Sequence, residues 1–308
     1  MLQSRTMRVC IETMVREIQD VISEAVERMD GCRLRQDTWT RPEGGGGISR
    51  ILQDGNVFEK AGVNISTVMG TLASEAARAL KLGGQETRET PLTFYATGVS
   101  VVIHPHNPMA PTVHANYRYF EIDDGRAQGS WWFGGGSDLT PAYLIESDAV
   151  HFHRMLKTAC DQHDPTFYPR FKQTCDDYFY LPHRGERRGV GGIFFDHLNE
   201  RNPEFYLAFV TDCARAFVPS YFPLIEKRKD MSFTAEQKAW QQLRRGRYVE
   251  FNLIHDRGTT FGIRTGGRIE SILMSLPRTA AWAYDHQPVV GSPEAMTIEV
   301  LKNPRTWV

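Results

Sequence analysis

The sequence lacks paired cysteines. Its 308 residues include five cysteines, which stand singly with no C-x-x-C pair. An odd number of scattered cysteines argues against both a disulfide framework and a thiolate zinc site. We therefore expect free thiols in a reducing compartment.

Long apolar runs and an excess of charge are also absent. No run of about eighteen apolar residues occurs, and acidic residues interrupt the apolar spacing near the N-terminus, unlike a secretory signal. Lys and Arg total 36 against 37 Asp and Glu, for a net charge of -1. This balance predicts no nucleic-acid partner and no obligate membrane partner. A cytoplasmic location is the expectation.

Several well-known catalytic motifs are missing as well. The glycines 134–136 are not followed by Lys and Ser or Thr, and they lack the Rossmann spacing. The chain contains neither G-x-S-x-G nor a persuasive Cys/His pairing. Acyl-enzyme chemistry and a phosphate-binding loop are therefore disfavoured.

The periodicity of apolar residues predicts a single α+β domain spanning 1–308. Residues 1–30 form an amphipathic helix, because apolar residues recur at helical spacing over 11–29. Runs of strands beside runs of helices favour an antiparallel sheet over alternating βαβ units. The expected strands are 92–104, 112–121, 129–134, 247–254 and 259–264, and the expected helices are 146–161, 166–180, 201–217 and 234–245.

The segment 112–121 carries the densest polar pattern. Alternation along a strand puts His114, Asn116 and Arg118 on one face, and Val113, Ala115, Tyr117 and Tyr119 on the other. A row of this kind is suited to catalysis or ligand binding, and His114 is a candidate for general acid–base work. Ser100 and His104 alternate onto one face of the preceding strand, so Ser100 is a candidate ligand contact.

Two further residues carry specific chemistry. Arginine pairs bidentately with carboxylate or phosphate, so Arg118 and Arg268, the latter after Gly266 and Gly267, suit a small polyanionic substrate. Asp138 follows a Trp-Trp-Phe-Gly-Gly-Gly segment, where its carboxylate could accept N–H donors of a flat ligand. A helix N-cap or turn role for Asp138 remains open.

Histidines invite a metal interpretation, because neutral imidazole is a common transition-metal ligand. The candidate ligands are His104, His114, His153 and His183. Their spacing matches no metal motif, and His153 falls on the apolar side of its predicted helix. From local sequence, a core role for His153 is the stronger interpretation.

Eight segments together resemble one known family. They are GGGGISR, FEKAGVNIS, GVSVVIHPHNP, HANYRYF, WWFGGGSDLTP, CDDYFYLPHRGERRGVGG, RRGRYVEFNL and TGGRIESILMSLP, and they resemble the oxygen-dependent coproporphyrinogen-III oxidases. The resemblance runs from about residue 40 to the C-terminus. It implies a large antiparallel β-sheet covered by helices on both faces, and a homodimer formed through residues 248–283.

The resemblance also implies a reaction and its site. Two propionates of coproporphyrinogen III become vinyl groups, giving protoporphyrinogen IX in heme and porphyrin biosynthesis, with molecular oxygen as co-substrate and no organic cofactor. The matching positions are His114 as proton donor, Asp138 as the carboxylate that holds pyrrole N–H groups, and Ser100, Asn116, Tyr117, Arg118, Gly266, Gly267 and Arg268 as substrate contacts.

Two alternatives stay open beside this reading. His104, His114, His153 and His183 match positions described as binding a divalent metal, such as manganese, in bacterial members. A histidine-metal oxygenase is therefore one alternative. A tetrapyrrole-binding protein without turnover is the other.

Overall fold

The computed structural model describes residues 2–42, 44–71, 92–123, 130–264 and 266–308. Its centre is a seven-stranded antiparallel sheet with the strand order β1-β2-β3-β4-β5-β6-β9. The strands are β1 (Arg35–Thr40), β2 (Gly45–Gln53), β3 (Phe58–Thr71), β4 (Thr93–Pro105), β5 (Thr112–Asp123), β6 (Ser130–Thr140) and β9 (Gly191–Leu198). A small second sheet pairs β7 (Tyr180–Leu181) with β8 (Glu186–Arg187).

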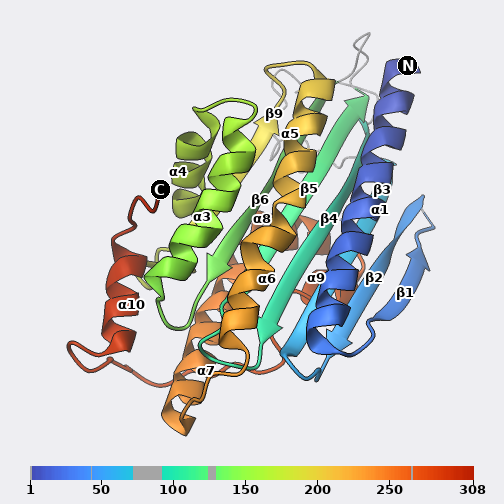
Figure 1. The fold of residues 1–308 in the computed structure, drawn as a ribbon. Coiled ribbons are helices and arrows are strands. Elements are labelled where there is room, and N and C mark those ends of the chain that lie inside the picture. The colour runs from blue at the N-terminus through green and yellow to red at the C-terminus, as the bar shows by residue number, and fades with distance from the viewer. Residues whose placement is uncertain (1, 43, 72–91, 124–129, 265) are drawn as a thin grey trace.

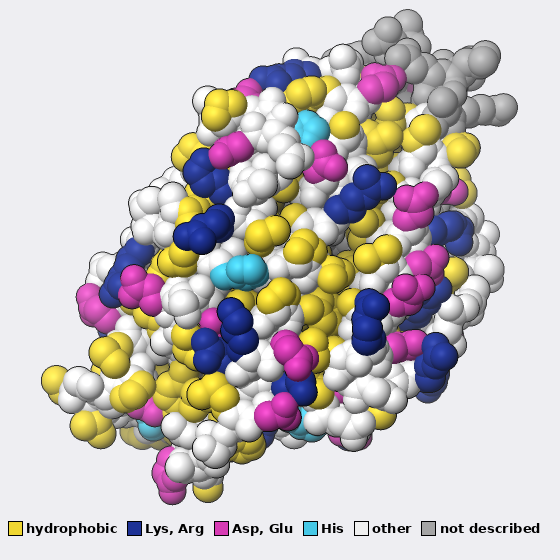
Figure 2. Space-filling view, in the orientation of Figure 1, with side chains coloured by type: hydrophobic (Ala, Val, Ile, Leu, Met, Phe, Trp, Pro, Cys, Tyr) yellow, Lys and Arg dark blue, Asp and Glu magenta, His cyan; other side chains and the backbone are white. Residues whose placement is uncertain are grey.

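One layer of helices covers the face of the sheet that is turned toward the viewer in Figure 1. It contains α1 (Leu2–Asp30), α3 (Glu146–Asp161), α4 (Phe167–Tyr178), α5 (Pro203–Arg215) and α6 (Phe217–Arg228). The main hydrophobic core lies between this layer and the sheet. Figure 2 shows basic and acidic side chains interspersed over this side of the molecule, without a field of one sign.

The C-terminal elements extend behind the sheet and along its edge (Figure 1). They are α7 (Ala235–Glu250), the π-helical turn η1 (Phe251–His255), α8 (Arg257–Arg264), α9 (Ile269–Leu273) and α10 (Pro293–Lys302). With helices on both faces of the antiparallel sheet, the predicted α+β fold is confirmed. In the described parts of the chain, no helix is long and apolar enough to cross a bilayer.

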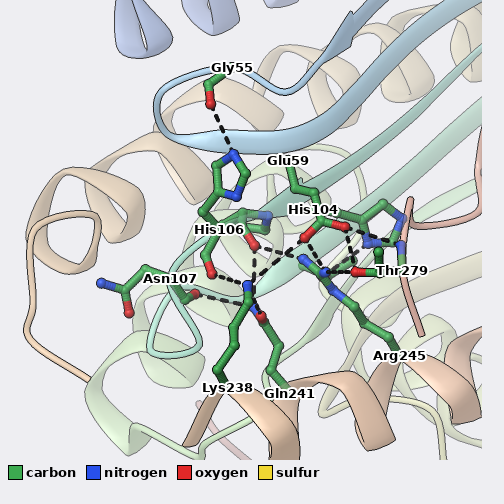
Figure 3. A network of polar contacts seen from close by, with 11 residues as sticks. Gly55, Glu59, His104, His106, Asn107, Lys238, Gln241, Arg245 and Thr279 are labelled. Atoms are coloured by element: carbon green, nitrogen blue, oxygen red, sulfur yellow. Dashed lines mark hydrogen bonds and ion pairs between the residues drawn. The ribbon is translucent and has the colours of Figure 1, made fainter. Parts of the chain in front are cut away.

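Helix α7 is fixed to the sheet by a buried polar network (Figure 3). Arg245 forms an ion pair with Glu59 and donates to the Pro105 carbonyl at 2.8 Å. Lys238 donates to the His106 carbonyl at 2.6 Å. The Thr279 hydroxyl lies 3.0 Å from Glu59, so the same carboxylate also holds the segment that follows α9. The network therefore holds the C-terminal elements against the ends of β3 and β4.

Two of the predicted strands are wrong. Residues 247–254 and 259–264 are helical, in α7, η1 and α8, and not strands. The strand predicted at 129–134 is confirmed from Ser130 and continues to Thr140, so glycines 134–136 are strand residues. A Cβ added at Gly135 or Gly136 would lie within 2.5 Å of a carbonyl oxygen of a neighbouring strand. These glycines therefore permit close strand pairing.

Candidate active site

A row of polar side chains crosses the sheet on the face opposite the helix layer. The predicted alternation in β5 is confirmed, because His114, Asn116 and Arg118 are partly exposed while Val113, Ala115, Tyr117 and Tyr119 are buried. The register pairs Ser100 with Asn116, and His114 with Asp138. The structure therefore brings Ser100, His114, Asn116 and Asp138 together.

Tyr117 is the exception among the predicted contacts. Its side chain points to the opposite face, where it is buried and its hydroxyl donates to the Cys213 carbonyl in α5 at 3.1 Å. Only its backbone belongs to the strand that carries the polar row. Its side chain contributes to the core.

Asp138 is buried next to His114, its register partner on β5. Its Oδ1 accepts from His114 Nδ1 at 2.8 Å, and both of its oxygens accept from Arg188 Nη2, at 3.0 and 2.9 Å. Burial would raise the pKa of this carboxyl, but the charge of Arg188 and the hydrogen bond from His114 outweigh it and lower that pKa. Asp138 is therefore ionised at neutral pH. It lies in a strand, so the helix N-cap alternative is wrong.

Arg188 is a residue that the sequence-based interpretation did not assign. Its guanidinium is packed among the rings of Phe179, Tyr248 and Phe251, at 4.1 to 4.9 Å from their centroids. It also donates to Asn252 at 2.9 Å. Arg188 lies in the turn between β8 and β9, so it contacts Asp138 in space but is 50 residues away from it in the sequence. The only signal was its place in the GERRGVGG segment.

His114 is the accessible end of this array. Its Nδ1 contacts Asp138, its side chain is 21% exposed, and Nε2 has no partner among the residues that the structure describes. A carboxylate that accepts from Nδ1–H fixes the imidazole tautomer and orientation. His114 can therefore exchange a proton with a ligand through Nε2.

Arg118 lies farther along the same face of β5, with Asn116 between it and His114. Its Nη1 donates to Asn116 Oδ1 at 3.2 Å, and its Nη2 lies 3.0 Å from Asp196. Gly134 is its register partner on β6, and a Cβ there would lie 3.0 Å from Arg118 Nε. The guanidinium thus lies directly over a glycine. Asp196, like Arg188, had not been assigned from sequence.

Arg268 stands at the far side of the sheet. It donates to Asp37 on β1 at 2.5 Å and to Ser271 at 3.2 Å, and Ser271 lies 3.1 Å from Ser49 on β2. Four strand spacings of ~4.8 Å separate β1 from β5, so the strands that hold the partners of Arg268 and Arg118 lie about 19 Å apart across the sheet. Gly266, with φ of 67°, and Gly267 precede Arg268 in the segment between α8 and α9. The predicted arginines therefore mark two ends of one surface.

The four candidate metal-binding histidines do not converge. His104 is held by Thr112 and the Ser275 carbonyl, and His153 by the Tyr168 hydroxyl and the Val190 carbonyl. Burial lowers the pKa of each ring to about 3, so both are neutral. His153 is fully buried, which confirms its predicted core role.

His183 lies elsewhere, 2.7 Å from Glu250. Within the described residues, no three His, Cys, Asp or Glu side chains are grouped as metal ligands. The predicted donor set therefore does not fit a metal ion.

The arrangement has clear chemical capacity. It offers one guanidinium for a carboxylate and one imidazole for proton exchange on the same strand face, next to a strand that lacks side chains at Gly134 and Gly136. The ionised Asp138 holds the imidazole in place. Such a site can bind an anionic group of a ligand through Arg118 and exchange a proton with another part of the same ligand through His114.

Comparisons with known proteins agree on one family. A family model described as coproporphyrinogen III oxidase matches residues 10–307. Coproporphyrinogen-III oxidase 1, chloroplastic, of Arabidopsis thaliana is 57% identical over 99% of this chain and 80% of its own length. The mitochondrial oxygen-dependent coproporphyrinogen-III oxidase of Homo sapiens is 58% identical over 98% of this chain and 67% of its own length.

These comparisons correct one expectation. Relatives from Arabidopsis thaliana and Glycine max are named chloroplastic, and the relative from Homo sapiens is named mitochondrial. The expected cytoplasmic location is contradicted by these names. Balanced charge and the lack of a secretory signal do not distinguish the cytosol from an organelle interior, which explains the error.

Proposed function

This chain belongs to the coproporphyrinogen III oxidase family, and we propose that it oxidises two propionate groups of coproporphyrinogen III to vinyl groups, giving protoporphyrinogen IX. Each conversion releases one carbon dioxide and two electrons with the hydrogen from the carbon next to the ring. Dioxygen accepts these with one proton and becomes hydrogen peroxide. The chain is thus an oxygen-dependent oxidoreductase.

The observation that carries this proposal is that Arg118 and His114 lie on one face of β5, with Asn116 between them. Arg118 binds a propionate carboxylate, and Arg268 binds another at the far side of the sheet. Ser100 and Asn116 lie between them and contact the macrocycle. Gly266 and Gly267 let the backbone approach the ligand beside Arg268.

In this proposal His114 is the group that exchanges the proton. Its Nδ1 is engaged by Asp138, which leaves Nε2 for the ligand. We assign Asp138 a positioning role, because its two oxygens are already engaged by His114 and Arg188. This proposal differs from the expectation that Asp138 binds the pyrrole N–H groups itself. Its charge acts on the substrate through His114.

Assays with coproporphyrinogen III in air and under nitrogen test the reaction. We expect protoporphyrinogen and carbon dioxide to form only with oxygen. A His114→Gln variant should lose turnover by about 100-fold or more while still binding the unreactive porphyrin coproporphyrin III. Binding without turnover by the wild-type protein would favour the non-catalytic alternative instead. Turnover under nitrogen would refute oxygen as the acceptor.

Asp138→Asn separates the two roles that this residue has been given. Asparagine keeps the shape but cannot stabilise the His114 orientation with a charge, so kcat should fall with little change in binding. If Asp138 held the pyrrole N–H groups directly, binding of coproporphyrin III would weaken as well. That result would return Asp138 to the ligand-binding surface.

The chain also forms a homodimer in this proposal, through residues 248–283. Support comes from apolar side chains exposed within that segment, namely Leu253, Ile254, Ile263, Ile269 and Trp282. Exposed apolar groups of this density are typical of interfaces between protein chains. Light scattering should give twice the mass of one chain, and an Ile254→Glu, Ile263→Glu variant should give a monomer. A wild-type monomer would contradict the proposal.

A further inference from the structure

The strand β9 is irregular where it passes the polar row. Its register with β6 shifts between Phe133 and Gly135, and His197 has a φ of 56°, in the left-handed region. A non-glycine residue in this conformation is strained, so the surrounding structure must hold it. The His197 ring stacks on Trp132 at 5.0 Å. Bulges of this kind redirect a side chain, and the redirected neighbour is Asp196.

Asp196 lies between the guanidinium groups of Arg118 and Arg257. Its Oδ1 lies 3.0 Å from Arg118 Nη2, on the sheet. Its Oδ2 lies 3.9 Å from Nη2 of Arg257, which begins α8 behind the sheet. A Cβ at Gly134 would lie 2.7 Å from Asp196 Oδ1. The missing side chain therefore allows the contact between Asp196 and Arg118.

The charge at this position is nearly balanced. Burial would raise the pKa of Asp196, but hydrogen bonding from His197 and the charge of Arg118 outweigh it and hold that pKa well below its ordinary value. Asp196 is therefore a permanent anion beside two permanent cations. The three groups leave one positive charge, which matches one carboxylate of a ligand.

The Arg118–Asp196 pair differs from a purely structural ion pair. Arg188 and Asp138 are each 2% exposed in their side chains, whereas Arg118 is 35% and Asp196 19% exposed. Solvent therefore reaches the Arg118–Asp196 pair but not the Arg188–Asp138 pair. Asp196 contacts Arg118 through Nη2, so a propionate that approaches from solvent competes with Asp196 for the same guanidinium.

We propose that Asp196 takes the place of a substrate carboxylate on Arg118 in the empty site and yields Arg118 when a propionate binds, which limits how tightly the site holds carboxylates. The inference rests on the proposed role of Arg118 as a propionate ligand. Asp196 thereby weakens binding by competition. It also returns to Arg118 when the propionate leaves, so the arginine is never left unpaired.

Asp196→Asn isolates the charge. Asparagine can keep the hydrogen bonds from His197 N and Arg118 while removing the competing anion. We expect coproporphyrin III, followed by its fluorescence, to bind about three- to tenfold tighter, with a steeper dependence on ionic strength. Asp196→Glu should bind as the wild type does. Unchanged or weaker binding by Asp196→Asn would overturn the proposal.

A matched control removes a carboxylate from another arginine on the other face of β5. Glu121 accepts from Arg8 at 2.8 and 3.2 Å, so Glu121→Gln should leave porphyrin binding unchanged. An equal gain in affinity in this control would show a general charge effect and overturn the proposal.

Arg118→Gln separates this inference from the proposed function. If Arg118 binds a propionate, Arg118→Gln should weaken porphyrin binding, and adding Asp196→Asn to it should give no further gain. Weaker binding by Arg118→Gln without a gain from Asp196→Asn refutes only the inference. No effect of Arg118→Gln refutes the proposed role of that arginine.

Discussion

Replacing Arg188 by methionine is expected to lower the free energy of unfolding by about 3–5 kcal/mol at neutral pH. Arg188 and Asp138 are each 2% exposed, and Arg188 donates to both carboxylate oxygens. Methionine fills much of the space but leaves a buried carboxylate with His114 as its remaining partner. Removing one member of such a pair costs more than the pair contributes, because the other charge is left uncompensated.

The matched comparison is Arg8→Met. Arg8 also binds a carboxylate with two nitrogens, at Glu121, but its side chain is 37% exposed. Solvent screening reduces such a pair to about 1 kcal/mol or less. Urea unfolding followed by tryptophan fluorescence gives the midpoint and slope for both variants. Equal losses in the two variants would refute the argument from burial.

The pH dependence supplies a second check. In the wild type the pKa of Asp138 is lowered, so its ionised carboxylate stabilises the folded protein at any pH above the ordinary pKa of an aspartate. This stabilisation is lost as pH falls toward the lowered pKa. Without Arg188, burial dominates and raises that pKa above its unfolded value. The variant then regains stability as pH falls through the raised pKa, so its deficit should be smaller at pH 5 than at pH 8. A deficit that does not change with pH would contradict this mechanism.

Three further predictions follow from local geometry. Glu250 has a pKa of about 2, because hydrogen bonds and nearby positive charge outweigh the effect of burial. The stability that its ionised carboxylate contributes should therefore be lost as pH falls from about 4.5 to 2. In Glu250→Gln, the urea midpoint should change less with pH across that range. Gly134→Ala places a Cβ 3.0 Å from Arg118 Nε and should weaken coproporphyrin III binding by about tenfold, measured by fluorescence titration. Dialysis against a chelator should leave turnover and the melting temperature unchanged, because His104 and His153 are held by protein groups; activity restored by manganese would contradict this.

The polar face of β5 could be predicted because its signal is local. One face of that strand packs against helices, so alternation alone separates His114 and Arg118 from the buried Tyr117 and Tyr119. The same reasoning failed over 247–254. Tyr248 and Phe251 are typical of strands, but here their rings pack on Arg188 from a helix.

Arg188 and Asp196 could not be assigned because their partners are distant in the chain. Arg188 is 50 residues from Asp138, and only the pairing of β6 with β9 brings the segments together. The contact between Asp196 and Arg118 depends further on a bulge at His197. A shift of register by one residue reverses the face of every side chain, and periodicity gives no sign of it. The resemblance to known enzymes located the site but not these contacts.

The solvent exposure of three arginine–aspartate pairs at the candidate site indicates how it can bind a polyanion and still release it. Arg188–Asp138 is sealed, so it keeps its charges together and orients His114. Arg268–Asp37, with side chains 28% and 33% exposed, resembles Arg118–Asp196 in being open to solvent. Two open pairs at the two sides of one surface let a carboxylate replace an aspartate at each. The cost of breaking each pair offsets the gain, so affinity is limited while selectivity for carboxylates is kept.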